Sequence, residues 1–391
     1  MHYAKTIDIY RLILAFFVCV ITDGYVFSTY QPIAGFATIA FFILTGYMIC
    51  RETANFEERM KRAIKRTAIL FGIFLAACLL ADVIFCIAMD IIYRGQLEVS
   101  TFWNFKAFLR LRTWFELLVL NVWPMSVTTV VSYMTYGIIR LDVLPFGQCL
   151  WFLQSLLYAY IILFVLHKLK LTQKKWFDPV VCIVLLLFAL VSGELSSLLN
   201  FHVFNYEYIP GNFLTRALPY ILVGRLIFRW QRKLKRYPKY VYIIAAAAGV
   251  GLSVLEIMLL SRFGKLTYAG HLFGNGVLAA ALTVLVVTMP VRPAQKKPFN
   301  GGLVAKVVYL SHEAVSFCVM TLTVLVAPTM SESVLGAMPF VTYLLCCLGV
   351  LVYALVVNFK NRDKSHGSHH GSHHSSRHGR NPLQALKDFV K

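Results

Sequence analysis

Ionisable side chains inside long apolar runs are the part of this sequence best suited to chemistry. Asp8 and Arg11 lie in the first apolar run, and His312 and Glu313 lie in a run near the end of the chain. A charged group in such a run is costly, so it faces other helices or a cavity and marks a candidate site. An imidazole works as a general base near neutral pH, which makes His312, with Glu313 beside it, a catalytic candidate. The pair belongs to a polar set spaced i, i+3, i+4 and i+7 on one helical face: Tyr309, His312, Glu313 and Ser316.

Arginines at the start of the third apolar segment suit an anionic ligand. Arg59, Arg62 and Arg66 recur every three or four residues, and Arg11 is predicted to lie on the same side of the membrane. Guanidinium forks match the geometry of phosphate, so a nucleotide-bearing cofactor fits these four residues. Anchoring to anionic lipid is the alternative for the arginines and the preferred interpretation of the lysines between them.

A second polar level is predicted near the opposite side of the membrane. It brings together Thr22 and Asp23 of the first run with residues of later runs. A charge-balanced pocket is the functional interpretation, and a set of interhelical hydrogen bonds is the structural one. Arg216 needs an acidic partner, which Glu194 or Glu256 could supply. The polar residues of the later runs are Trp151, Gln154, Ser155, Tyr158, Glu194, Arg216, Glu256 and His271.

The composition says which elements must hold these residues. Of the 391 residues, 59% are hydrophobic and 14% are charged. Soluble domains carry about 45–50% apolar and about 25% charged residues, so this chain is predicted to be a polytopic membrane protein. Its net charge of +20 comes from basic residues between the apolar runs, as in cytoplasmic loops, which argues against a nucleic-acid partner.

Ten apolar runs are long enough, or nearly so, to cross a bilayer as helices. They are continuous rather than alternating, which favours an all-α fold over a barrel. We therefore expect about ten transmembrane helices in a domain of residues 1–360. The runs are 7–26, 33–50, 68–89, 150–166, 180–198, 213–228, 240–260, 271–287, 307–327 and 340–357.

Loop charge predicts the orientation of these helices. The loops after the second, fourth, sixth and eighth runs hold about twenty Lys and Arg residues. The short loops after the first, fifth, seventh and ninth hold only Arg262 and Lys265. Since basic loops stay in the cytoplasm, both termini are predicted to be cytoplasmic. Residues 94–149 are then outside, and the apolar stretch 117–139 within them is read as a re-entrant segment or a lipid-surface helix.

The composition changes abruptly after Lys360. Six histidines between 366 and 378 are interleaved with Ser and Gly, which is typical of a disordered, low-complexity segment. We interpret residues 361–391 as a disordered cytoplasmic tail, either a solvated linker or an engineered affinity segment. Weak binding of zinc or nickel by the imidazoles is the alternative.

Five short segments follow the pattern of a known membrane family. They are Ile7–Arg11, with Asp shortly before Arg, Phe41–Tyr47 (FFILTGY), Leu150–Tyr160 (LWFL, then LLYAY), Val308–His312 (VYLSH) and the pair Arg59 and Arg62. In these segments the chain resembles the acyltransferase 3 family over roughly residues 5–358. It is also similar to the membrane domains of the serine racemases of vancomycin resistance.

This resemblance implies transfer of an acyl group, usually acetyl, from a cytoplasmic acyl-CoA such as acetyl-CoA to a hydroxyl of a cell-envelope sugar or polymer. The arginines would bind the donor, and Tyr47 would join Thr22, Trp151, Gln154 and Arg216 as acceptor contacts. The implied location is a bacterial plasma membrane. The expected partners are the lipid bilayer, the acyl-CoA and a glycan or other hydroxyl-bearing acceptor, and no metal is expected.

One position departs from the family pattern. The family has a His eleven residues after the first-helix Arg, where this chain has Thr22. A Thr hydroxyl is no general base at neutral pH, so Asp23, or His312 with Glu313, would have to take that role. The alternative function is a catalytically degenerate member that binds or transports a small polar solute such as an amino acid. A scaffold for envelope synthesis is a third interpretation.

Overall fold

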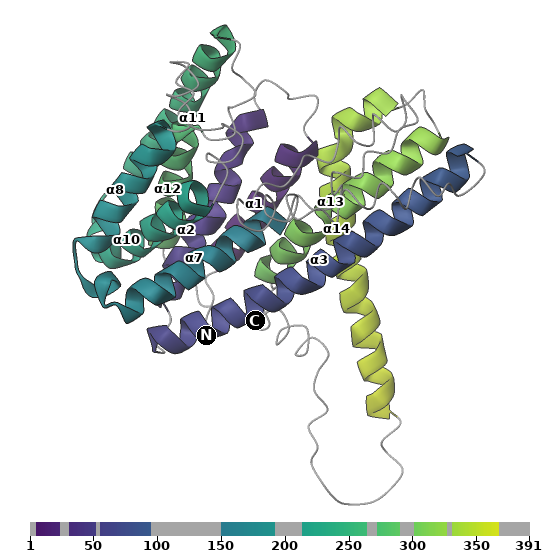
Figure 1. The fold of residues 1–391 in the computed structure, drawn as a ribbon, viewed down its shortest axis with the longest axis horizontal. Helices are drawn as coiled ribbons and strands as arrows, with labels where there is room; N and C mark the ends of the chain where they lie inside the picture. The colour runs from purple at the N-terminus through teal and green to yellow at the C-terminus, as the bar shows by residue number, and fades with distance from the viewer. Residues whose placement is uncertain are drawn as a thin grey trace, which may run out of the picture. The chain divides into compact units, whose positions relative to one another are not determined.

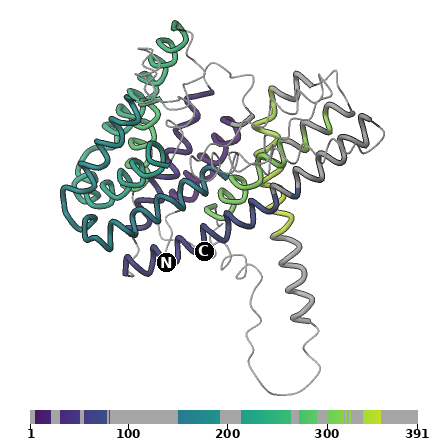
Figure 2. The backbone as a smooth tube through the Cα atoms, viewed as in Figure 1, coloured from purple at the N-terminus to yellow at the C-terminus, as the bar shows by residue number. Residues whose placement is uncertain are grey.

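The computed structural model describes residues 5–23, 31–51, 55–94, 150–191, 213–263, 272–289, 301–326 and 331–366 (Figures 1 and 2). Within these ranges the chain is helical and contains no strand. The predicted re-entrant segment 117–139 and the His-rich stretch after residue 366 lie outside the described residues. The all-α prediction is therefore confirmed for the part of the chain that is described.

Each of the ten predicted runs overlaps a helix in the described part of the chain. Because the runs are continuously apolar, burying them in lipid or against one another requires every backbone group to be bonded within the segment, as a helix does. The helices are α1 (Lys5–Asp23), α2 (Phe36–Arg51), α3 (Phe56–Arg94), α7 (Leu150–Lys168), α8 (Phe177–Leu190), α10 (Leu218–Leu234), α11 (Lys239–Arg262), α12 (Phe273–Thr288), α13 (Gly301–Val326) and α14 (Ser331–His366).

Within the described ranges, four segments are long and apolar enough by themselves to cross a membrane. They are Gln31–Cys50, Leu150–Lys168, Lys239–Arg262 and Gly336–Tyr353. Helices α8 and α12 are shorter apolar helices. Large apolar side chains are exposed along α8 and α11, among them Ile183, Leu187, Ile244 and Met258. Such surfaces suit lipid contact, and the chain is a membrane protein; ten crossings and cytoplasmic termini remain predictions.

The chain divides into two compact units, Phe27–Pro290 in one and Met1–Val26 with Val291–Lys391 in the other. In the larger unit, α2 and α10 pack through glycines. A Cβ added at Gly46 would lie 2.0 Å from the carbonyl oxygen of Ile221, and one at Gly224 would lie 2.0 Å from that of Ile43. Small residues let membrane helices approach this closely. The contact fixes the depth of the residue after Gly224, which is Arg225.

The smaller unit contains α1, α13 and α14. The rings of Phe340 and Tyr343 on α14 pack on Phe16 of α1, with centroids 5.1 and 5.4 Å away. The Tyr343 hydroxyl donates to the carbonyl oxygen of Leu12 at 3.3 Å. Helix α13 meets α1 through Gly301, where a Cβ would lie 2.9 Å from the carbonyl oxygen of Asp8.

Candidate functional site

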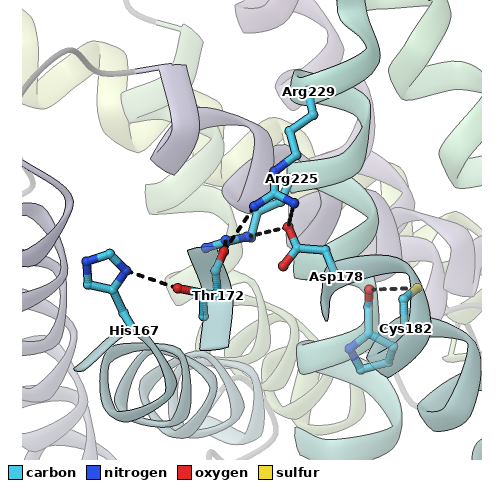
Figure 3. A network of polar contacts seen from close by, with 7 residues as sticks. His167, Thr172, Asp178, Cys182, Arg225 and Arg229 are labelled. Atoms are coloured by element: carbon cyan, nitrogen blue, oxygen red, sulfur yellow. Dashed lines mark hydrogen bonds and ion pairs between the residues drawn. The ribbon is translucent and has the colours of Figure 1, made fainter. Parts of the chain in front are cut away.

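Among the described residues of the larger unit, one buried carboxylate is shared by two arginines of α10 (Figure 3). Oδ2 of Asp178 accepts from Nε of Arg225 at 3.1 Å and lies 3.0 Å from Nη1 of Arg229. The side chain of Asp178 is fully buried, Arg225 is 5% exposed and Arg229 is 33% exposed. Arg229 therefore lies at the solvent-accessible edge of the cluster and Arg225 lies deeper.

The loop between α7 and α8 is held against the same two arginines. The carbonyl oxygen of Thr172 accepts from Nη2 of Arg225 at 3.5 Å and from Nη2 of Arg229 at 3.1 Å. A ring nitrogen of His167, Nδ1, is 3.0 Å from the Thr172 hydroxyl (Figure 3). Asp178 lies in the first turn of α8, where the helix dipole favours an anion.

Phe56 joins this cluster to the basic stretch of α3. The guanidinium carbons of Arg59 and Arg225 lie 5.8 and 5.3 Å from the centre of the Phe56 ring, within cation–π range. The His167 ring lies 4.4 Å from the same ring. Nη1 of Arg59 also donates to the carbonyl oxygen of Ile49 at the end of α2. Arg59, Arg225 and Arg229 thus gather around one aromatic ring and one carboxylate.

The four predicted donor-binding arginines do not all join this cluster. Arg59 is half-buried, whereas Arg62 and Arg66 are exposed on α3. Nε of Arg62 donates to the carbonyl oxygen of Glu58 on its own helix at 3.4 Å. Arg11 belongs to the smaller unit. Arg62 and Arg66 lie on nearly the same face of α3 as Arg59, but about 4.5 and 10.5 Å further along the helix axis.

An N-cap hydrogen bond and two ion pairs lie at the beginning of α3. The side-chain oxygen of Asn55 accepts from the backbone N–H of Glu57 at 3.2 Å, which is the usual N-cap bond. The Glu57 carboxylate bridges Lys61 at 2.9 Å and Lys168 of α7 at 2.7 Å. Hydrogen bonds from Lys168 and Lys61 lower the pKa of Glu57 to about 2. This bridge fixes the start of α3 beside the end of α7.

In the smaller unit, Asp8 and Arg11 form an ion pair 3.3 Å long, one helical turn apart. The pair lies at the start of α13, where a Cβ at Gly302 would be 2.7 Å from Nη1 of Arg11 and 3.2 Å from Oδ1 of Asp8. His312 is ten residues further on, about 15 Å along the helix. The Asp8–Arg11 pair and His312 are therefore separated along α13 by about three helical turns.

His312 has a geometry that a general base requires. It is buried, and its Nδ1 is 2.8 Å from the carbonyl oxygen of Tyr309. A carbonyl oxygen only accepts, so Nδ1 carries the proton and donates, and Nε2 keeps its lone pair. Glu313 is buried beside it in sequence. Thr22 and Asp23 end α1, and their side chains lie outside the described residues.

The predicted acceptor contacts come together only in part. The guanidinium carbon of Arg216 lies 5.1 Å above the Trp151 ring, and the Gln154 side-chain amide donates to the Tyr158 hydroxyl at 3.0 Å. A π-helical turn, Phe213–Ala217, positions Arg216 before α10 begins, and such turns are frequent at functional sites. Tyr47 lies elsewhere, with its ring 5.7 Å from that of Phe228.

Glu256 makes a structural contact. Its Oε2 accepts from the backbone N–H of Gly274 at 3.1 Å, at the beginning of α12. Beside it, the buried Ser253 hydroxyl donates to the side-chain oxygen of Asn275 at 3.0 Å, and the Asn275 amide donates to the carbonyl oxygen of Pro32 at 2.8 Å. For this part of the second polar level, the geometry thus favours interhelical hydrogen bonds over a binding pocket.

Sequence reasoning missed Asp178, Arg225 and Arg229. A signal for Arg225 was present, because it is an ionisable residue inside the predicted run 213–228. Arg229 was counted only as positive charge in a loop, and Asp178 precedes the run that it belongs to structurally. The pairing of residues 47 positions apart needs the tertiary structure.

Helices of membrane length with exposed apolar faces and buried ion pairs define an all-helical membrane protein. A family model described as an acyltransferase domain, acyltransferase 3, matches residues 5–359. The chain therefore belongs to the acyltransferase 3 family, and the resemblance drawn from the short motifs is confirmed. Comparison with curated proteins and with solved structures finds no match.

Proposed function

We propose that this membrane acyltransferase takes an acyl group, acetyl in the simplest case, from an acyl-CoA and transfers it to a hydroxyl of a cell-envelope sugar or polymer. The observation that supports the donor assignment is the cluster in which Arg225 and Arg229 contact the Asp178 carboxylate while Arg59 and Arg225 share the Phe56 ring. Two guanidinium groups on one carboxylate, with a third nearby, leave excess positive charge for a phosphate-bearing ligand. Loop charge predicts this end of the unit to be cytoplasmic, where acyl-CoA is found.

His312 supplies the base in this proposal. Its Nε2 takes the proton of the acceptor hydroxyl while the oxygen bonds to the acyl carbon, and the carbon–sulfur bond then breaks. The departing thiolate of coenzyme A takes the proton back from the imidazolium. Asp23 stays the other candidate for this role, because it neighbours the position at which the family carries its His. Arg216 over Trp151, with Gln154 and Tyr158, is the proposed contact for the acceptor.

Donor binding gives the test, with a matched control on the same helix. Arg59→Ala and Arg62→Ala each remove one positive charge from α3, but only Arg59 lies in the cluster. With purified protein in phosphatidylcholine nanodiscs, we expect Arg59→Ala to weaken acetyl-CoA binding roughly 10- to 100-fold, the range for a lost hydrogen bond to a charged group. Arg62→Ala should stay within about threefold of wild type. If Arg59→Ala and Arg62→Ala weaken acetyl-CoA binding equally, or if neither weakens it, the donor does not bind at this cluster.

A second candidate function has a specific observation behind it. Thr22 occupies the position of the family His, which fits a degenerate member that binds or transports a small polar solute instead of transferring an acyl group. Arg216 over Trp151 would then contact the anionic group of the solute. Binding of acetyl-CoA without any transfer, together with saturable binding of an amino acid, would favour this alternative.

A further inference from the structure

The ion pair between Asp178 and Arg225 contains one hydrogen-bond donor and one acceptor that are not satisfied. Within the described part of the chain, Nη1 of Arg225 and Oδ1 of Asp178 are buried and have no hydrogen-bond partner. Nε of the same guanidinium bonds Oδ2 of the same carboxylate, so the two unmet atoms belong to one ion pair. A buried polar atom left unbonded is costly, so a ligand that pairs with both atoms gains from binding here.

The charge at the cluster selects the kind of ligand. Asp178 offsets one of the two arginines that it contacts, so one positive charge stays uncompensated among these three residues. An anion is therefore favoured over a neutral group. The anion must accept a hydrogen bond from Arg225, and it must also donate one to the Asp178 carboxylate, which only accepts when ionised.

A phosphate monoester meets both requirements. Its second pKa is near 6, so it retains a proton in part of the population at neutral pH and can donate through that P–O–H group. The internal diphosphate of a nucleotide and a carboxylate have no such proton at this pH. Arg229, a third exposed, supplies a second guanidinium at the accessible edge.

We propose that Arg225, Arg229 and Asp178 form a binding site for a phosphate monoester, and that the group bound there is the terminal 3′-phosphate of coenzyme A. This assignment rests on the proposed function, because it presumes an acyl-CoA donor. The donor site then has two parts. Arg59, on the other side of the Phe56 ring, contacts another part of the donor. The buried cluster of Arg225, Arg229 and Asp178 binds the 3′-phosphate. Asp178 acts as a positioning residue for both guanidinium groups and as acceptor for the phosphate proton.

Coenzyme A and dephospho-coenzyme A, which lacks only the 3′-phosphate, are the matched probes. We expect wild-type protein in phosphatidylcholine nanodiscs to bind coenzyme A roughly 10- to 100-fold more tightly than dephospho-coenzyme A. Arg229→Ala should abolish this preference by weakening coenzyme A alone. Arg229→Lys should restore it only partly, because an ammonium lacks the fork. Asp178→Asn should also reduce it, since the amide no longer orients two cations.

Arg232→Ala is the control, because it removes an equal charge from an exposed position one turn along α10. It should leave both affinities unchanged. Arg59→Ala should weaken both probes alike and keep their ratio. The thermal unfolding temperature of each variant shows whether the substitution has only destabilised the loop between α7 and α8. If Arg229→Ala does not fold, the Arg229→Lys variant provides the same comparison of the two probes.

Three outcomes overturn the proposal in distinguishable ways. If wild type binds neither probe, the proposed donor itself fails. If wild type binds both probes and Arg229→Ala leaves the ratio of the two affinities unchanged, the protein binds the donor, but the cluster only holds the loop between α7 and α8 in place. If added phosphatidic acid, a lipid with a phosphate monoester, competes with coenzyme A in wild type but not in Arg229→Ala, a lipid headgroup is the occupant instead.

Discussion

His312 and Thr22 decide how this chain could perform acyl transfer without the first-helix His of its family. The Tyr309 carbonyl fixes the His312 tautomer with Nε2 unprotonated, which is the state a general base needs. The sequence motif identified His312 as a candidate base. Which ring nitrogen carries the proton could be inferred only from the contact with the Tyr309 carbonyl in the structure.

Substitution at three positions identifies the base. If His312 takes the hydroxyl proton, His312→Ala should lower the turnover number about 10²- to 10⁴-fold with acetyl-CoA binding unchanged. Asp23→Asn should then have little effect, and the reverse pattern would assign the base to Asp23. Thr22→His places an imidazole on the face of Arg11, and we expect it to raise the rate. Radiolabelled acetyl transfer and donor binding are measured together for each variant.

Close helix contacts explain why the polar residues of the larger unit lie where they do. The TGY segment of α2 was noticed for its resemblance to the family, and its glycine has a physical role against Ile221 of α10. Continuous apolar runs predicted the helices well because their pattern is local. Which helices pack together could not be predicted, because an apolar helix face that contacts another helix and one that is exposed have similar residue compositions. Arg216 lies over the Trp151 ring, and Glu194, one of the two acidic partners suggested for it, lies outside the described residues.

Gly46→Ala tests this contact. The added methyl would lie 2.0 Å from a backbone oxygen that cannot rotate away, so α2 and α10 must separate. Overpacking costs typically about 1–3 kcal/mol, and we expect a lower unfolding temperature and weaker acetyl-CoA binding. Gly251→Ala on α11 is the control, because nothing lies within 4 Å of its Cβ position. Equal stability of the two variants would contradict the close approach.

The bridge from Glu57 to Lys61 and Lys168 predicts a pH effect on the junction of α3 and α7. The folded pKa of about 2 lies below the ordinary value of 4.5, so the ionised carboxylate stabilises the folded state. This stabilisation is complete above about pH 4.5 and is lost as pH falls towards 2. The difference in unfolding temperature between wild type and Glu57→Gln should therefore shrink between pH 5 and pH 3. A difference independent of pH would show that the bridge contributes nothing as an ion pair.

The loop charges predict the membrane topology of the whole chain. The basic loops that follow even-numbered runs predict that positions 174 and 235 face the cytoplasm and position 205 faces out. Cysteine substitutions at these positions, treated in intact cells with an impermeant thiol reagent, should gain labelling over wild type only at 205. Labelling at 174 would contradict the arrangement of ten helices and would move the arginine cluster away from cytoplasmic acyl-CoA.

Acyl transfer itself is the most direct test of the proposed function. Purified full-length protein in lipid is incubated with acetyl-CoA labelled in the acetyl group and with a cell-envelope glycan preparation. We predict that the label moves to the glycan as an ester that mild base releases, with saturation by acetyl-CoA, and that His312→Ala or Asp23→Asn abolishes it. Bound acetyl-CoA without transfer, in wild type and in Thr22→His alike, would contradict an acyltransferase and leave solute binding as the function.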